Sequence, residues 1–273
     1  MQKKIVISLV TYNPLQNLLE KTLSDLVDAI KALKVHFGYN AVVIIVDNSP
    51  TLTFSLENVV GSVLLDIDFV FIKNPKNMGF GEGHNKAIAF FKDSDYHLVL
   101  NPDIEFKRDA ISNAICFMEK NKCCGLLTPY ATWPDGSIQR LCKKKPTFFD
   151  LFLRGFAPDF VKYIFHARLS KYEMSEYLTA EDIFWNPPIV SGCFMLFRTE
   201  ILQRLGGFNP RFFLYFEDFD ISLRAGKISR IAYVPQVKVV HHGGHASRKG
   251  WRHIWMFGRS MVTFFNIHGW RWW

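Results

Sequence analysis

Short apolar runs alternate with segments of helical periodicity along the first half of the chain. Apolar, often β-branched runs predict strands at 4–10, 41–46, 69–72, 97–100 and 125–128. Apolar residues recur at helical spacing from Leu15 to Leu33, and 83–91 and 109–120 have a similar pattern. Strands that alternate with helices predict an α/β fold with a mostly parallel sheet that helices cover on both faces.

The pattern changes in the second half of the chain. Trp133-Pro-Asp-Gly136 is a turn signal that predicts a hairpin. Residues 146–185 are aromatic and basic with weak periodicity, which indicates short helices or a cap. Further elements are expected as a strand at 189–197, the end of a helix at 221–226, and short strands at 230–234 and 237–240.

The end of the chain predicts an amphipathic helix. One side would carry Trp251, Ile254, Trp255, Gly258, Met261, Val262 and Phe265, with Arg248, Lys249, Arg252 and Arg259 elsewhere around it. Such a helix fits the surface of a membrane, and packing on the core or on a second subunit is the alternative. The closing Trp270-Arg-Trp-Trp273 favours the membrane, because Trp and Arg prefer the headgroup region of anionic lipid.

Composition and charge narrow the class of protein. A hydrophobic content of 49% in 273 residues is ordinary for a folded chain, and no linker divides it, so we expect one domain at 1–245 and a basic segment at 246–273. The net charge is +8, and residues 221–273 contain nine Lys or Arg and no acid. This asymmetry predicts an anionic partner. With neither a signal-peptide pattern nor a membrane-spanning stretch recognised, the expected location is cytoplasmic, peripheral on the inner face of the plasma membrane.

The strongest chemical signal is Asn101-Pro-Asp103, which follows an apolar strand. Ligands of open α/β sheets bind outside the carboxyl ends of the strands. A carboxylate there suits a hard cation that bridges to phosphates, and an Asp that caps the next helix is the alternative. Polar groups also follow the first two strands, at Thr11-Tyr-Asn13 and at Asp47, where they would bind a nucleoside or cap turns.

Two further motifs hold acids and imidazoles. Phe216-Glu-Asp-Phe-Asp220 sets three acids among aromatic residues, and a carboxylate against apolar walls has a raised pKa and acts as a general base. His241-His-Gly-Gly-His245 follows a strand and would add a metal ligand, or else a core or acceptor-binding histidine. The glycine loop at 77–85 lacks the G-x-G-x-x-G spacing, so it is a weak phosphate-binding signal.

Together these motifs resemble the inverting family 2 glycosyltransferases, most closely the bacterial rhamnosyltransferase-like branch that builds surface polysaccharides such as O-antigen. The motifs that carry the resemblance, in order along the chain, are 10–13, 46–48, 77–85, 101–104, 191–193, 206–208, 216–220 and the region of His241. The resemblance implies a GT-A fold, a dTDP- or UDP-sugar donor and Mg²⁺ or Mn²⁺. It also implies a lipid-linked glycan acceptor, and L-rhamnose as the sugar is inferred from the branch alone.

The resemblance also assigns roles to single residues. It implies a catalytic base at Asp218 beside Glu217, a metal ligand at Asp103, and a second metal ligand at His241 or His242. Acceptor contacts are expected from Trp185 and Asp220. Donor contacts are expected from Thr11, Tyr12, Asn13, Asp47, Asn77, Gly79, Asn85 and Asn101, the last of which stands where the family has the first acid of its DxD motif.

Other functions compete with this one. A sugar nucleotidyltransferase would normally carry a glycine-rich basic loop after the first strand, where this chain has Thr11-Tyr-Asn-Pro14. A peripheral-membrane or RNA-binding module would use the basic end of the chain alone, but no RNA-binding motif is found, so no nucleic-acid partner is expected. A homodimer remains the other use of the aromatic C-terminal segment.

Overall fold

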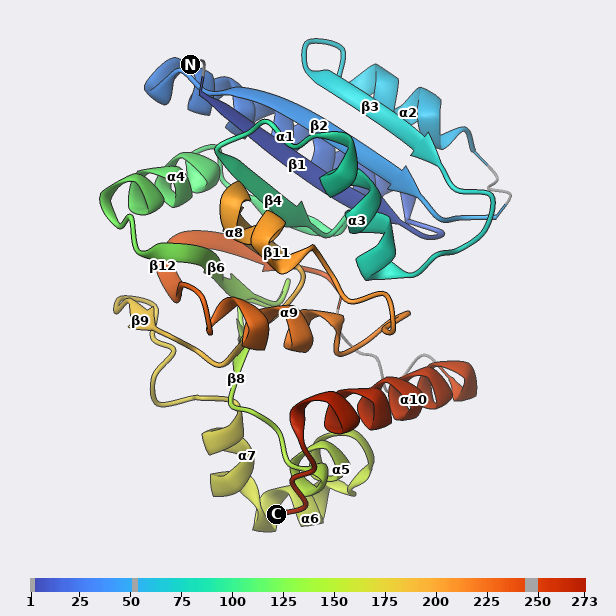
Figure 1. Ribbon diagram of the computed structural model, residues 1–273, viewed down its shortest axis with the longest axis vertical. Helices are drawn as coiled ribbons and strands as arrows, with labels where there is room; N and C mark the ends of the chain where they lie inside the picture. Colours follow the sequence, from blue (N-terminus) through green and yellow to red (C-terminus); the bar gives the residue numbers. More distant parts are fainter. Residues whose placement is uncertain (1–2, 51–53, 244–249) are drawn as a thin grey trace.

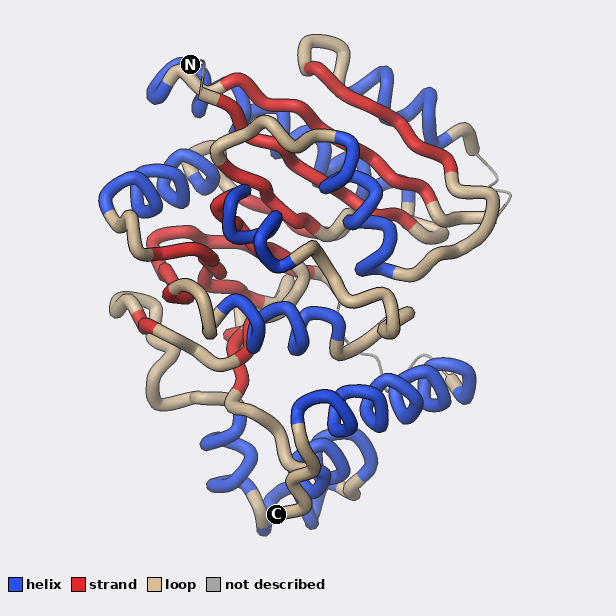
Figure 2. The backbone as a smooth tube through the Cα atoms, in the orientation of Figure 1, coloured by secondary structure: helices blue, strands red, loops and turns tan. Residues whose placement is uncertain are grey.

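The computed structural model describes residues 3–50, 54–243 and 250–273, and a central sheet organises them (Figures 1 and 2). The strands of this sheet pair in the order β3-β2-β1-β4-β11-β6-β12-β5, with β7 beside β6 and β9 beside β12; β8 and β10 form a separate pair. The strands are β1 (Lys4–Thr11), β2 (Asn40–Asp47), β3 (Asp68–Lys73), β4 (Tyr96–Leu100), β5 (Ile104–Phe106), β6 (Cys124–Thr132), β7 (Ile138–Gln139), β8 (Cys142–Lys143), β9 (Phe184–Trp185), β10 (Ile189–Val190), β11 (Phe194–Arg198) and β12 (Arg230–His241).

Helices connect these strands and form a second group at the C-terminal end of the molecule (Figure 1). They are α1 (Gln16–Phe37), α2 (Leu56–Val63), α3 (Phe80–Phe90), α4 (Ala110–Lys120), α5 (Phe148–Phe156), α6 (Asp159–Ile164), α7 (His166–Tyr172), α8 (Thr199–Leu205), α9 (Glu217–Ala225) and α10 (Trp251–His268). The expected helices near 15–33, 83–91 and 109–120 are confirmed as α1, α3 and α4.

Alternation along β1 explains why helices cover both faces of the sheet. Ile5, Ile7 and Leu9 belong to the core cluster that includes the apolar side of α1. Val6 and Val10 belong to a second cluster with Ala87 of α3. Successive side chains of a strand point to opposite faces, so a strand that is apolar at every position needs cover on both.

The sheet is wholly parallel in its first half, and in the second half β6 and β12 form a further parallel pair. β1 pairs in parallel with β2 and β4, and β2 with β3, as expected. Beyond β4 the sheet is mixed, because β11 runs antiparallel to both β4 and β6. The predicted hairpin is confirmed by the antiparallel pairing of β6 with β7.

Two strand predictions need correction. The single strand expected at 189–197 is interrupted at residues 191–193, so that β10 pairs with β8 outside the main sheet while β11 enters it. The two short strands expected at 230–234 and 237–240 are one strand, β12, with a register shift between Val234 and Lys238. Pro235 lies in that shift, where a residue without an N–H group is tolerated.

The expected amphipathic helix exists as α10, but its apolar side is divided between two environments. Met261 and Phe265 pack in an aromatic cluster with Phe212, Phe216 and Leu151. The expectation that these two residues face a lipid surface is therefore wrong. Trp251, Trp255 and Val262 are exposed. Arg248, Lys249, His245 and the expected domain boundary at 245/246 lie outside the described residues.

No helix in the described ranges is both long enough and apolar enough to cross a bilayer.

Candidate active site

Strand register brings the polar ends of three strands to one edge of the sheet. Thr11 is the register partner of Asp47, and Leu9 that of Leu100, the residue before Asn101. Because β1, β2 and β4 are parallel, their carboxyl ends open on the same side. The motifs expected at the first, second and fourth strand ends therefore share one edge.

Asp47 is buried at the end of β2, with 1% of its surface exposed. Its Oδ1 accepts hydrogen bonds from the Thr11 hydroxyl at 3.0 Å and from the Ser49 N–H at 2.9 Å. Its Oδ2 accepts from the Lys73 ammonium at the end of β3. Burial alone would raise the pKa of Asp47, but these hydrogen bonds outweigh it and lower the pKa, so the carboxylate is charged.

Lys73 was not anticipated from the sequence, although its place as the last residue of an apolar strand was a usable signal. Tyr12 and Asn13 follow Thr11 at the rim. Tyr12 is 54% exposed, and its ring is accessible for stacking on a base. Asn13 has a φ of 47°, and its N–H donates to the Ser49 hydroxyl at 2.8 Å, which fixes the turn.

The glycine loop before α3 is held by amide side chains. Asn77 Oδ1 accepts from the N–H of Gly79 at 2.9 Å, and Asn48 Nδ2 donates to the Gly79 carbonyl at 3.0 Å. Asn85 exchanges two hydrogen bonds of 2.8 Å with the backbone of Phe208. Asn77 and Asn85 therefore shape the loop in this structure, and the direct donor contacts expected of them stay a prediction.

Asp103 and His241 face each other across the sheet edge, where β5 pairs with the end of β12. The His241 Nε2 lies 3.5 Å from Asp103 Oδ1 and 3.2 Å from the Asn101 amide nitrogen. A Cβ at Gly243 would lie 2.4 Å from Asp103 Oδ2, so the glycine leaves room beside the carboxylate. The other histidine, His242, lies away from this group, with its Nε2 2.6 Å from Glu105.

Gln139 of β7 sets the tautomer of His241. The Gln139 amide nitrogen donates to the Gly243 carbonyl at 3.1 Å, so its oxygen is the acceptor for the His241 Nδ1–H at 2.9 Å. The Nε2 lone pair is then directed toward Asn101 and Asp103, as in metal sites whose histidine is oriented by a hydrogen bond. No sequence motif indicated a role for Gln139.

This donor set fits a divalent cation only with help from a ligand. In the described ranges no group of three or more His, Cys, Asp or Glu is placed to hold a metal. One carboxylate and one imidazole leave coordination positions that phosphate oxygens would fill, which is the usual arrangement for Mg²⁺ or Mn²⁺ at a nucleotide.

The acidic motif lies at the start of α9 and is presented by a strained turn. Tyr215 and Phe216, directly before it, have φ values of 69° and 65°. Non-glycine residues in this region cost about 1–3 kcal/mol and are kept where the surroundings impose them. Here the aromatic cluster beneath α10 contains Phe216, and the Phe213 carbonyl accepts from the N–H of Phe80 at 3.1 Å.

Burial raises the pKa of both acids at the start of α9. Glu217 is 5% exposed and its Oε2 has no hydrogen-bond partner among the described residues. Desolvation, followed by the charge of Asp218, raises the pKa of Glu217 to about 8. Desolvation raises the pKa of Asp218 to about 6, although the N–H groups of Gly192 at 3.1 Å and Phe219 at 2.9 Å donate to its carboxylate.

The tripeptide 191–193 links the Asp218 carboxylate of α9 to the group formed by Asn101, Asp103 and His241. Gly192 donates to Asp218, and the carbonyl of the next residue, Cys193, accepts from the N–H of Asn101 at 2.9 Å. Burial raises the pKa of the Cys193 thiol, and the charges of Asp103 and Asp218 both add to that rise. Asp103 and Asp218 are thus on the two sides of residues 191–193.

The structure does not bring the two expected acceptor residues to this edge. Trp185 pairs with Ala232 near the beginning of β12, whereas His241 ends that strand. Its ring packs beside Phe117 and under the Arg230 guanidinium, 4.0 Å from the centroid. Trp185 is therefore part of the packing at the opposite end of β12.

Asp220 is the second of these residues, and only 1% of its surface is exposed. Its carboxylate accepts from Arg224 Nε at 2.8 Å and from His268 Nε2 at 2.9 Å. The bond to His268 attaches the end of α10 to α9. Asp220 therefore supports the packing of these two helices and is not on an exposed surface.

The fold places the chain among proteins of GT-A type. GalNAc-T7, solved with UDP, GalNAc and Mn²⁺, superposes with a TM-score of 0.64 at 14% identity, covering 91% of this chain and 44% of that one. A mannosyltransferase of Pyrobaculum calidifontis, solved with GDP-Man and Mn²⁺, gives 0.56 at 18% identity, covering 92% and 59%. The expected GT-A fold is confirmed.

The family follows from the sequence itself. The family model described as glycosyl transferase family 2 matches residues 6–206, and the chain belongs to this family. The match includes the strand ends and residues 191–193, and it ends before α9 and the end of β12.

Curated relatives point to the expected branch. An N-acetylglucosaminyl-diphospho-decaprenol L-rhamnosyltransferase of Mycobacterium tuberculosis (strain H37Rv) is 26% identical over 216 residues, 72% of this chain and 66% of the relative. Rhamnosyltransferase WbbL of Escherichia coli (strain K12) is 30% identical over 182 residues, 62% and 63% of the two chains. The resemblance to the rhamnosyltransferase-like branch is confirmed, and the chain spans just under two thirds of the length of these relatives.

A substitution at Gly79 tests whether the glycine loop packs closely against the turn that precedes α9. Gly79 has a φ of 86°, and a Cβ there would lie 2.1 Å from the Phe213 carbonyl oxygen. Gly136 has a φ of 82° but has nothing within 4 Å of an added Cβ. We expect Gly136→Ala to lower the free energy of unfolding by about 1–2 kcal/mol, the cost of the left-handed backbone. Gly79→Ala should cost more, as measured by urea denaturation, and equal losses would contradict the close approach to Phe213.

Proposed function

We propose that the chain is an inverting glycosyltransferase that moves a sugar from a nucleoside diphosphate to a lipid-linked acceptor in bacterial surface polysaccharide synthesis. One observation carries this proposal: residues 191–193 join the partly buried base candidate Asp218 to the Asn101–Asp103–His241 group at one sheet edge. L-rhamnose, the sugar that the names of the relatives give, is the proposed sugar, with dTDP or UDP as the carrier.

Asp218 is the proposed catalytic base. Its carboxylate takes the proton from the acceptor hydroxyl while that oxygen attacks the anomeric carbon, in a single displacement that inverts the configuration. The Gly192 and Phe219 N–H groups orient the carboxylate, and burial makes it more basic than a solvated aspartate. Glu217, buried beside it, raises this basicity further whenever it is charged.

The donor would lie along the strand ends. Tyr12 and the Thr11–Asp47 pair are the proposed nucleoside side, and Asp103 with His241 would hold Mg²⁺ or Mn²⁺ at the diphosphate. The ion, when bound, stabilises negative charge on the departing nucleoside diphosphate. Gln139 keeps the His241 Nε2 lone pair directed toward this position, and Asn101 provides an amide beside it.

The proposed acceptor side includes a membrane surface. Exposed apolar side chains of α5, α6 and the C-terminal tail lie together, since α5 packs against α6 and its Phe149 stacks on Trp273 at 4.5 Å. We call this the apolar surface; it consists of Phe152, Phe156, Phe160, Tyr163, Ile164, Trp272 and Trp273. Arg154, Lys162 and Arg271 belong to the same three segments, and basic and aromatic side chains together favour anionic lipid.

Metal-dependent donor binding tests the site. We expect UDP or dTDP to bind in the presence of Mn²⁺, and the affinity to fall at least tenfold in Asp103→Asn and His241→Ala. His242→Ala is the matched control, because its imidazole contacts Glu105 instead of Asp103. Calorimetry with each nucleotide, with and without Mn²⁺, makes the comparison. Equal losses in the two histidine variants would remove His241 from the metal site.

The role of Asp218 has its own test. Asp218→Asn should lower kcat at least 100-fold while the dissociation constant of the nucleotide changes less than twofold, because the residue acts on the acceptor. The base must be ionised and its pKa is raised to about 6, so kcat/KM of the unmodified protein should rise with pH up to about 6 and level off above it. A profile that is flat between pH 4.5 and 7 would contradict this assignment.

Liposome sedimentation tests the apolar surface. Phe160 and Ile164 are each 69% exposed on α6, and we expect Phe160→Glu with Ile164→Glu to reduce binding to anionic vesicles several-fold. Leu65→Glu, at a residue 81% exposed after α2, is the control and should leave sedimentation unchanged. The same loss in both proteins would mean that added negative charge, and not this surface, decides binding.

A further inference from the structure

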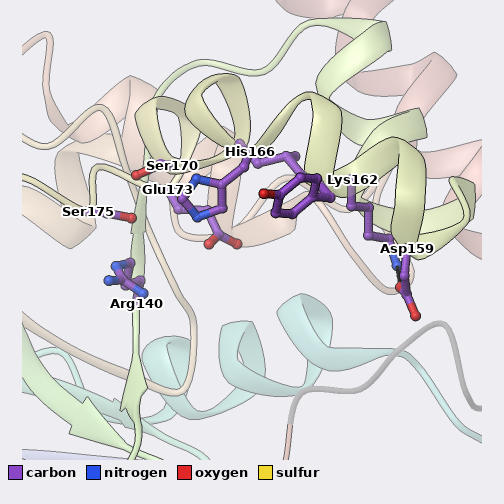
Figure 3. A pocket seen from close by; sticks show the side chains of 9 residues that line it. Arg140, Asp159, Lys162, His166, Ser170, Glu173 and Ser175 are labelled. Carbon is purple, nitrogen blue, oxygen red and sulfur yellow. Dashed lines mark hydrogen bonds and ion pairs between the residues drawn. The ribbon is translucent and has the colours of Figure 1, made fainter.

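A cavity of about 470 Å³ lies between the segment that joins β7 to β8 and the helices α6 and α7. Arg140 forms one side of it, and Lys162 and His166 line the other (Figure 3); Tyr163 is also a lining residue. In Figure 3 the Arg140 side chain lies across the cavity from His166 and Glu173. None of these residues belongs to the proposed donor site or to the base.

The cavity is suited to an anion with several oxygens. Its two carboxylates are already paired: Asp159 lies 3.2 Å from Lys162, and Glu173 lies 3.5 Å from both Lys143 and Arg154. Arg140 and Lys162 are the cationic side chains of the lining, and Lys143 and Arg154 add two more beside Glu173. Hydroxyl groups of Ser170, Ser175 and Tyr163 add hydrogen-bond donors to the lining.

Arg140 is the residue that most needs a ligand. Its Nε is buried and, within the described ranges, has no hydrogen-bond partner. A buried guanidinium donor without an acceptor is costly, and phosphate oxygens satisfy it in the two-point geometry that arginine prefers. Lys162 and His166 are placed on the opposite wall to complete such a contact.

The cavity lies between the proposed base and the apolar surface. Arg140 directly follows Gln139, which orients His241, and Glu173 of the cavity lining lies 3.5 Å from Arg154. Burial raises the pKa of Asp218 and the charge of Arg154 opposes that rise, so Arg154 also lies near the start of α9. On the other side, Tyr163 both lines the cavity and is 83% exposed on the apolar surface. The order along the molecule is apolar surface, cationic cavity, base.

We propose that this cavity binds the diphosphate of a prenyl-diphosphate-linked acceptor, with Arg140 as its principal ligand. This inference rests on the proposed function, and it adds the anchor that places the acceptor. The prenyl chain would leave past Tyr163 toward the membrane, and the sugar end would point to Asp218. The prenyl chain would then contact the apolar surface, the diphosphate would contact the cavity, and the sugar would lie at Asp218.

Direct binding tests this proposal without any transfer step. Farnesyl diphosphate is titrated into the full chain with Mn²⁺ and UDP or dTDP at saturation, so that the donor site is occupied. We expect binding that weakens at least tenfold in Arg140→Gln and is unchanged in Lys171→Gln, a control on the exposed side of α7. Because the Arg140 Nε has no hydrogen-bond partner within the described residues, its replacement breaks no hydrogen bond at that atom, and circular dichroism checks the fold.

The other possible results each contradict a different part of the proposals. Farnesyl diphosphate that binds both proteins equally overturns the assignment of Arg140. Inorganic pyrophosphate that binds as tightly as farnesyl diphosphate and competes with it would show a simple phosphate site and overturn the lipid assignment. Arg140-dependent prenyl binding without any sugar transfer to a prenyl-diphosphate acceptor would reject the proposed transferase while leaving the cavity assigned. With transfer present, Arg140→Gln should raise KM for the acceptor and leave KM for the donor unchanged.

Discussion

The site depends first on the register in which β1 pairs with its two parallel neighbours. Thr11 lies beside Asp47, and Leu9 lies beside Leu100, so three strand ends open on one edge. Because side chains alternate along a strand, a slip of one residue would turn every inward group to the opposite face. The apolar clusters on both faces of β1 exclude such a slip, and the same packing that stabilises the sheet therefore fixes the proposed donor site.

A second constraint is the close contact between the glycine loop and the turn before α9. The loop carbonyl and amide groups are held by Asn48 and Asn77, and the N-terminus of α3 is bonded to Phe213. The turn then passes through two left-handed residues before Glu217. This geometry places Asp218 and Glu217 in a desolvated position, where burial raises the pKa of both, so the fold itself supplies the basicity that the proposed mechanism needs.

The C-terminal helices extend this arrangement away from the sheet. α10 contributes Phe264 and Phe265 to the aromatic cluster that supports Phe216, and the Asp220–His268 hydrogen bond attaches it to α9. The helix expected at a membrane is thus also part of the support of the proposed base. A further set of exposed apolar side chains lies on α5, α6 and the tail, and Tyr163 of this set also lines the cationic cavity. The proposed lipid-facing surface, the proposed diphosphate site and the proposed base follow one another in this order, as a protein that receives its acceptor from a membrane would need.

The sequence by itself determined the central strands, the long helices, the hairpin, the family and the motifs at the strand ends, because these signals are local: periodicity, turn residues and short polar motifs. Only the tertiary structure decided which residues meet. It directed His241 rather than His242 toward Asp103, placed Trp185 at the far end of β12, and buried Asp220 between α9 and α10. It also showed Gln139 and Arg140, whose neighbours are distant in sequence. Strand pairing and helix packing set such long-range contacts, and no pattern within a short stretch of chain records them.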